Sequence, residues 1–256
     1  AGYHDPQARD APGAEEARFR MSAAPVGYRP VATLDDAARS AFITRVYQHL
    51  LLAVGAFVLF EALLINLGVA EAMWDFFASS SAAWLLLLGG FMVVSWLATS
   101  AAHDVLEPSR QYAGLFGLAA AEALIFAPFL HYFFEVQPNG GSTVVAAALI
   151  TAAGFAGLTA VAFVTRRDLS FLRPLLLWGG VSALVLIGAA ILFGLSLGIW
   201  FSVAMIALAG GSILYTTQTI IRRYPEDAYV GALVQLFASV MLLFWYVLRL
   251  MGQLRG

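Results

Sequence analysis

The amino-acid sequence predicts an all-α, polytopic membrane protein with seven transmembrane helices. Of its 256 residues, 61% are hydrophobic and only 12% are charged, whereas soluble proteins average roughly 45 to 50% apolar and 25% charged residues. After the first 41 residues the chain divides into apolar runs. At a rise of 1.5 Å per residue, each run is long enough to cross a hydrocarbon core of about 30 Å. The short loops between the runs leave no room for a large soluble domain.

Two parts of the chain are distinguished by composition. Residues 1–41 are polar and mix arginine with aspartate and glutamate, and we predict that they form a flexible cytoplasmic tail. This tail has no apolar core of the kind that a cleavable secretory signal needs. Residues 42–256 are predicted to form the seven-helix transmembrane domain. The predicted spans are residues 42–66, 82–102, 111–134, 144–165, 174–194, 198–221 and 228–251.

Two of these spans depend on small residues. Residues 174–221 contain no charge and are too long for one span, so the turn-like stretch FGLSLG predicts a tight hairpin between two helices. In the fourth span, Ala152, Ala156 and Ala160 recur every four residues on one face. Such a face lets helix backbones approach closely in a membrane. We therefore expect the fourth helix to lie in the interior of the bundle.

The positions of the arginines predict the topology. The loops on the side of the tail carry six arginines: Arg110, Arg166, Arg167, Arg173, Arg222 and Arg223. The loops on the opposite side, residues 67–81, 135–143 and 195–197, carry none. The positive-inside rule therefore places the amino terminus in the cytoplasm. Arg249 and Arg255, at the end of the seventh span, are the only arginines that oppose this rule.

Several classes of protein are disfavoured by what the chain lacks. It contains no cysteine and no lysine, so a thiolate metal site and the Schiff base of a retinal pigment are both excluded. The four histidines are scattered, and no H-E-x-x-H motif occurs. We expect no catalytic residue, metal site or cofactor, and no nucleic-acid partner.

Glu122 is the acid that lies deepest in the predicted membrane. It falls in the middle of the third span, with about 15 Å of hydrocarbon on either side. A charged group there costs free energy, and acids inside membranes usually serve a function. Glu122 is therefore expected to be a proton or cation site in a polar pathway. Alternatively, it is a neutral, protonated acid that hydrogen bonds to a backbone carbonyl and joins helices.

Glu61 and Arg249 are predicted to lie at compatible depths. Glu61 stands in the outer third of the first span, among otherwise uncharged residues, and Arg249 stands near the outer end of the seventh. A charge-assisted ion pair between them would explain both and would serve as a structural or gating contact. In the alternative, each side chain reaches the headgroup region independently.

Four segments of the sequence resemble a known family. GLTAVAFVTRRDLSFL (residues 157–172), LYTTQTII (214–221), YPEDAYVGAL (224–233) and LLFWYVLRLMG (242–252) resemble motifs of the transmembrane Bax-inhibitor-motif family, which includes bacterial YccA-like members. The resemblance covers roughly residues 42–252. It implies a bundle in which the last helix is central, surrounded by two layers of three helices. It also implies a pH-sensitive calcium leak and a bacterial inner membrane location.

This sequence departs from the family at the residues that the resemblance assigns to pH sensing. Family members often carry two aspartates, where this chain has Thr216 and Ser239. The chain is thus a divergent member that lacks the aspartate pair, and neither residue can supply the like-charge coupling of such a pair. Glu122 is expected to take over the buried acidic role.

Two functions remain open from the sequence. In the first, the bundle conducts cations, calcium ions or protons, passively or in a proton-linked manner, along a pathway with Glu122, Thr216 and Ser239. In the second, the protein transports nothing and regulates another membrane protein, such as a membrane protease, as some bacterial relatives are associated with doing. The arginine-rich tail and the IIRRYPEDAY loop would then be its working surface.

Overall fold

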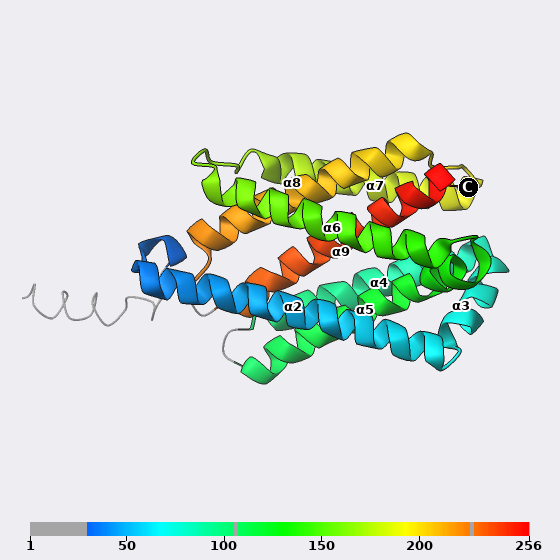
Figure 1. The fold of residues 1–256 in the computed structure, drawn as a ribbon, viewed down its shortest axis with the longest axis horizontal. Helices are drawn as coiled ribbons and strands as arrows, with labels where there is room; N and C mark the ends of the chain where they lie inside the picture. Colours follow the sequence, from blue (N-terminus) through cyan, green and yellow to red (C-terminus); the bar gives the residue numbers. More distant parts are fainter. Residues whose placement is uncertain (1–29, 105–106, 226–227, 256) are drawn as a thin grey trace, which may run out of the picture.

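The computed structural model describes residues 30–104, 107–225 and 228–255, and helices dominate them. In chain order the elements are η2 (Val31–Thr33), α2 (Asp36–Asn66), α3 (Val69–Ala78), α4 (Ser81–Ala102), α5 (Pro108–His131), η3 (Tyr132–Val136), α6 (Gly140–Val164), α7 (Leu172–Phe193), α8 (Ile199–Arg223) and α9 (Tyr229–Arg255). The long helices run along the longest axis of the molecule (Figure 1). We call its two ends the η2 end and the α3 end, after the short helix that each carries.

Seven helices of the described residues are long and apolar enough to cross a membrane, which confirms the predicted fold class. The predicted spans agree with α2 and α4 to α9 apart from a few residues at their ends. The largest difference is at α2, which begins at Asp36 because the side chain of Asp35 accepts a hydrogen bond from the Ala38 amide at 2.7 Å. Such a cap satisfies one of the free amides of the first turn. Residues 1–29 of the predicted tail lie outside the described residues.

Two turns use a glycine in the left-handed region. Gly194, with φ of 66°, ends α7 and starts the hairpin to α8, so the predicted division between these two helices is confirmed. Gly68, with φ of 72°, separates α2 from α3. Glycine adopts this conformation without the steric cost of a Cβ atom. The short helix α3 was not predicted, because ten residues between two spans are too few to be distinguished from a loop.

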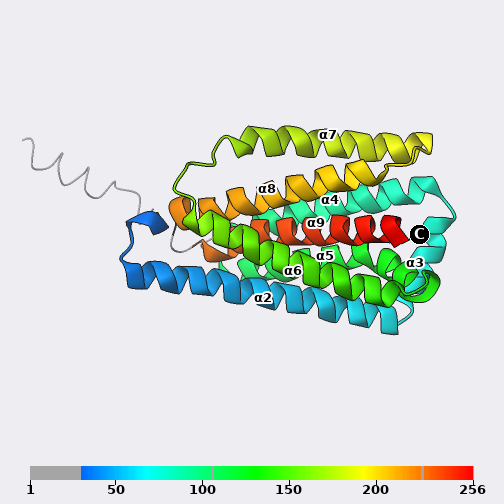
Figure 2. The same ribbon diagram turned by 45° about the horizontal axis from the view of Figure 1, so that its top comes forward.

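Two helices form the centre of the bundle. In the most apolar stretch of α9, 72% of the residues are buried, and in that of α5 61% are buried, against 28% or less for every other predicted span. α9 packs against α2, α4, α5, α6 and α8, and in Figure 2 it runs between α7 on one side and α2 on the other. The central position of the last helix is therefore confirmed. The comparable burial of α5 was not predicted from the sequence.

The prediction for the fourth span was wrong. Ala152, Ala156 and Ala160 are all exposed on the surface of α6, although other residues of this helix pack against α8 and α9. The reason is rotational: a run of small residues allows close contact, but it does not decide which face of a uniformly apolar helix meets its neighbours.

Candidate functional site

Glu122 lies near the middle of α5, where the helix is enclosed by the bundle. Its side chain is only 6% exposed, and it forms no hydrogen bond with any other described residue. The neighbouring Ala119 and Ala123 are fully buried, so α5 is in close contact with other helices at this level. The carboxyl group therefore cannot turn out to solvent.

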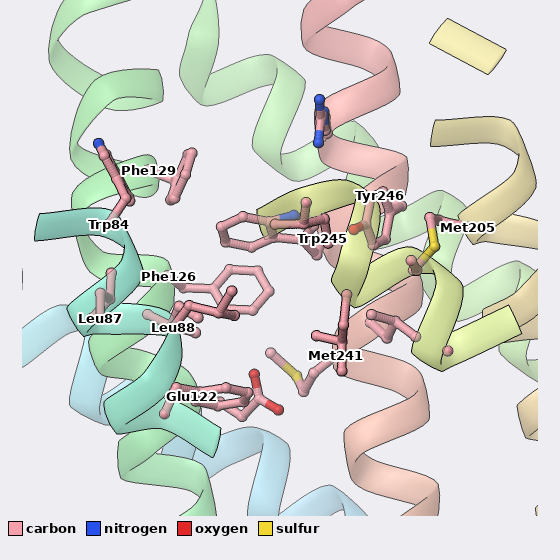
Figure 3. A pocket seen from close by; sticks show the side chains of 18 of the residues that line it. Trp84, Leu87, Leu88, Glu122, Phe126, Phe129, Met205, Met241, Trp245 and Tyr246 are labelled. Carbon is pink, nitrogen blue, oxygen red and sulfur yellow. The ribbon is translucent and has the colours of Figure 1, made fainter. Parts of the chain in front are cut away.

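The Glu122 side chain faces a cavity of about 480 Å³. Residues of α4, α5, α7, α8 and α9 line it, and most of them are apolar (Figure 3). Met205 and Met241 contribute thioether sulfurs, which are weak acceptors. The charged groups in the lining are Glu122 and Arg249. The cavity therefore has the size of a typical ligand pocket, roughly 300 to 1,000 Å³, with few polar groups.

An aromatic cluster bounds the cavity towards the α3 end. The Trp245 ring lies 4.8 Å from the ring of Phe126 and 4.4 Å from that of Phe129, both edge to face, and the Phe129 ring lies 4.9 Å from that of Trp84. Beyond this cluster lies a second pocket of about 810 Å³. Phe129, Trp245 and Arg249 line both spaces. The two spaces thus adjoin at an aromatic constriction with one arginine beside it.

Arg249 does not pair with Glu61, so the predicted ion pair was wrong. A guanidinium nitrogen of Arg249 donates to the Leu197 carbonyl at 2.8 Å, and the group lies 5.7 Å from the centre of the Phe201 ring. Both carboxyl oxygens of Glu61 are buried without a hydrogen-bond partner among the residues that the structure describes. The two residues therefore contact different neighbours.

Glu61 lines a different cavity. This space, of about 470 Å³, lies between α2, α5, α6 and α9, and its lining is almost wholly apolar. The Glu61 side chain is 5% exposed, so its burial matches that of Glu122. The structure therefore contains two buried, unpartnered glutamates in separate cavities, and Met241 of α9 contributes to the lining of both.

Thr216 and Ser239 are buried but do not line the Glu122 cavity. The Ser239 hydroxyl lies 2.8 Å from that of Ser212, a contact that joins α8 to α9, and it donates to the Gln235 carbonyl at 2.9 Å. α8 ends at the η2 end and α9 begins there. Thr216 comes later in α8 than the residues that line the cavity, and Ser239 comes earlier in α9. Both therefore lie nearer the η2 end than the cavity does. Ser212 was not predicted, and its spacing of four residues from Thr216 was the available signal.

A hydrogen-bonded cluster joins three helices near the η2 end. The Tyr112 hydroxyl lies 2.9 Å from Nε2 of His49 and 3.0 Å from the Tyr229 hydroxyl. His49 belongs to α2, Tyr112 to α5 and Tyr229 to α9. No local pattern predicts that these groups meet, since they are distant along the chain.

The segment between α6 and α7, which contains the DLSFL motif, is held by the end of α8. The Gln218 side chain accepts from the Leu169 amide and donates to the Arg167 carbonyl, both at 2.7 Å. Arg223 lies 3.2 Å from the carboxylate of Asp168. Hydrogen bonds from the hydroxyl and amide of Ser170, and then the charge of Arg223, hold the pKa of Asp168 below its usual value.

These features define a class: a polytopic helical membrane protein with a central last helix and buried intramembrane acids. A family model described as "Inhibitor of apoptosis-promoting Bax1" matches residues 39–256. The chain therefore belongs to this Bax inhibitor family, as the resemblance predicted.

Bacterial proteins are among its relatives. An uncharacterized protein of Pseudomonas aeruginosa is 33% identical over 143 residues, which cover 54% of this chain and 61% of the relative. An uncharacterized protein of Neisseria meningitidis is 26% identical over 191 residues, covering 73% of this chain and 82% of the relative. A protein of Vibrio cholerae described as an uncharacterized membrane protein is 28% identical over 127 residues, covering 47% of this chain and 54% of the relative. The chain thus spans a little under two thirds of the length of the Pseudomonas relative.

Proposed function

We propose that the protein forms a gated pathway for cations, protons or calcium ions, in which Glu122 is the acid at the centre of the membrane. The observation that carries this proposal is that Glu122 is buried, has no hydrogen-bond partner among the described residues, and lines a cavity. A buried acid costs free energy, and its retention inside a membrane is usually linked to transport or proton transfer. In this proposal the protein is a transport protein and not an enzyme.

The route in the proposal begins at the α3 end. The second pocket, of about 810 Å³, leads to the aromatic constriction, and the Glu122 cavity lies on the other side of that constriction. The described residues hold no group of three His, Asp or Glu that could bind a metal ion. Calcium prefers six to eight oxygen ligands, so one carboxyl group supports passage of the ion better than tight binding.

The pathway is closed in this conformation. Towards the η2 end, the contact between Ser212 and Ser239 holds α8 against α9. Thr216 is buried one turn farther along α8. Conduction through the predicted polar positions therefore requires α8 and α9 to separate. Arg249 beside the constriction adds a positive charge that opposes cations, so it must move or be neutralised before they pass.

The proposal includes a location. By the positive-inside rule, the η2 end faces the cytoplasm of a bacterial cell and the α3 end faces outward across the inner membrane. The lipid bilayer is then the immediate partner of the exposed apolar surface. The partner-binding alternative, regulation of a membrane protease or another membrane protein, would instead use the charged η2 end.

The test is calcium uptake into dye-loaded liposomes that contain the purified full-length protein, between about pH 5 and pH 8. Wild type should give uptake that depends on pH, and Glu122→Gln should lower it severalfold and flatten that dependence. Glu61→Gln is the matched control, because it neutralises the other buried glutamate in a separate cavity. Equal uptake by wild type and Glu122→Gln would contradict the proposal. Folded protein that gives no uptake above empty liposomes would favour the partner-binding alternative.

A further inference from the structure

Two arginines of α9 line the pocket at the α3 end. Arg249 and Arg255 both belong to its lining, together with the amides of Gln137 and Gln253 and several aromatic residues, but no acidic side chain in the described part of the chain contributes. The pocket has a volume of about 810 Å³. It is therefore a concave site with a net positive lining.

These arginines keep hydrogen-bond donors for a ligand. Arg249 donates to the Leu197 carbonyl at 2.8 Å, and Arg255 donates to the hydroxyl of Thr143 at 2.8 Å. A guanidinium has five N–H donors, so these bonds use only part of the capacity. Neither arginine forms a salt bridge with an acid in the part of the chain that the structure describes. An anion would supply the missing counter-charge.

The same two arginines are those that oppose the positive-inside rule. An arginine on the outer side has no role in setting the predicted topology. A shared role in one pocket would explain why both arginines lie on the outer side.

The pocket adjoins an apolar space. Phe129, Trp245 and Arg249 line both this pocket and the Glu122 cavity, whose lining is mostly apolar and whose volume is about 480 Å³. Leu184 of α7 lines the cavity and is 41% exposed. A positive headgroup site next to an apolar cavity fits a molecule with an anionic head and one hydrocarbon chain.

We propose that the protein binds a single-chain anionic amphiphile, with its carboxylate or phosphate against Arg249 and Arg255 and its acyl chain in the Glu122 cavity. A fatty acid and a lysophospholipid share this chemistry. A cationic amphiphile fits less well, since its headgroup would have to reach Glu122 at the centre of the membrane. Binding does not depend on permeation, so this inference and the proposed function can fail separately.

The first test measures binding of radiolabelled myristate to the purified full-length protein in a neutral detergent. Arg249→Gln and Arg255→Gln should each weaken binding about tenfold, as expected for the loss of a charge-assisted hydrogen bond. Arg173→Gln, which removes an exposed arginine near the η2 end, is the matched control and should stay within about twofold of wild type. Arg249→Lys keeps the positive charge and should bind better than Arg249→Gln, which separates loss of charge from misfolding.

The second test varies the headgroup and the cavity. Methyl myristate and tetradecyltrimethylammonium should compete at least about tenfold more weakly than myristate. Ala183→Leu fills the cavity from α7 and should weaken myristate binding while leaving both arginines in place. Competition by lysophosphatidylglycerol but not by lysophosphatidylcholine would identify phospholipid as a source, and competition by myristate alone would identify free fatty acid. The proposal would be overturned if methyl myristate bound as well as myristate, or if myristate binding were unchanged in both Arg249→Gln and Arg255→Gln. It would also be overturned if the protein preferred tetradecyltrimethylammonium and Glu122→Gln abolished that preference.

Discussion

The two halves of α9 are both mostly apolar but have different surroundings. Towards the η2 end, from Val230 to Phe237, most of its side chains are fully buried, and a Cβ atom on Gly231 would lie 2.9 Å from the His103 ring. Towards the α3 end, its residues from Val240 onward line the three cavities described above. The difference shows that burial of an apolar helix does not ensure close packing. The neighbours decide how much space remains, and the space remains in the half that holds both candidate sites.

The largest effect is expected from one added methyl group in the tightly packed half. A Cβ atom on Gly114 of α5 would collide with the carbonyl oxygen of Ala98 and lie 2.7 Å from the amide nitrogen of Ala102, both in the backbone of α4. A helix backbone cannot move aside locally, so Gly114→Ala should destabilise the protein by about 1 to 3 kcal/mol. Thermal unfolding in detergent measures this loss.

The same substitution in the hollow half is the control. Gly180 of α7 lines the Glu122 cavity, and a Cβ atom on it would have no described residue within 4 Å apart from its own stretch of helix. Gly180→Ala should leave stability unchanged or raise it by up to about 1 kcal/mol, the helix preference of alanine over glycine. Equal destabilisation by the two substitutions would show that the halves do not differ in packing.

The sequence predicted the positions of the spans well, because about 20 consecutive apolar residues are a strong local signal. It also predicted that Glu122 lies near the middle of its helix, since depth along a helix follows from counting residues. The pairing of Glu61 with Arg249 and the interior face of α6 were wrong for a shared reason. Both depend on the rotation of each helix about its axis, which a uniformly apolar sequence does not encode. The cavities depend on side chains from up to five helices and have no local signal at all.

A medium effect is expected from the hydrogen bonds that close the packed half. Tyr112→Phe removes the hydroxyl that lies between His49 and Tyr229, and it leaves both partners without that bond. The free energy of unfolding should fall by about 1 to 2 kcal/mol. Tyr132→Phe is the matched control in the hollow half, because the Tyr132 hydroxyl has no hydrogen bond among the described residues. It should change stability by less than about 0.5 kcal/mol, and an equal loss in both variants would contradict a special role for the His49 cluster.

The smallest effect is expected at the exposed surface of the η2 end, where the contribution of a charge depends on pH. Ser170 and then Arg223 lower the pKa of Asp168 in the folded protein. A lowered pKa means that the ionised form stabilises the fold above the unfolded value of about 3.9, and that this stabilisation is lost as the pH falls through the folded value. Asp168→Asn should therefore lower Tm at pH 7 by no more than about 2 °C, because the pair is solvent-exposed. The difference from wild type should close as the pH falls below about 4. A difference that stayed constant down to pH 3 would mean that Asp168 acts through its hydrogen bonds to Ser170, which asparagine retains in part, and not through its charge.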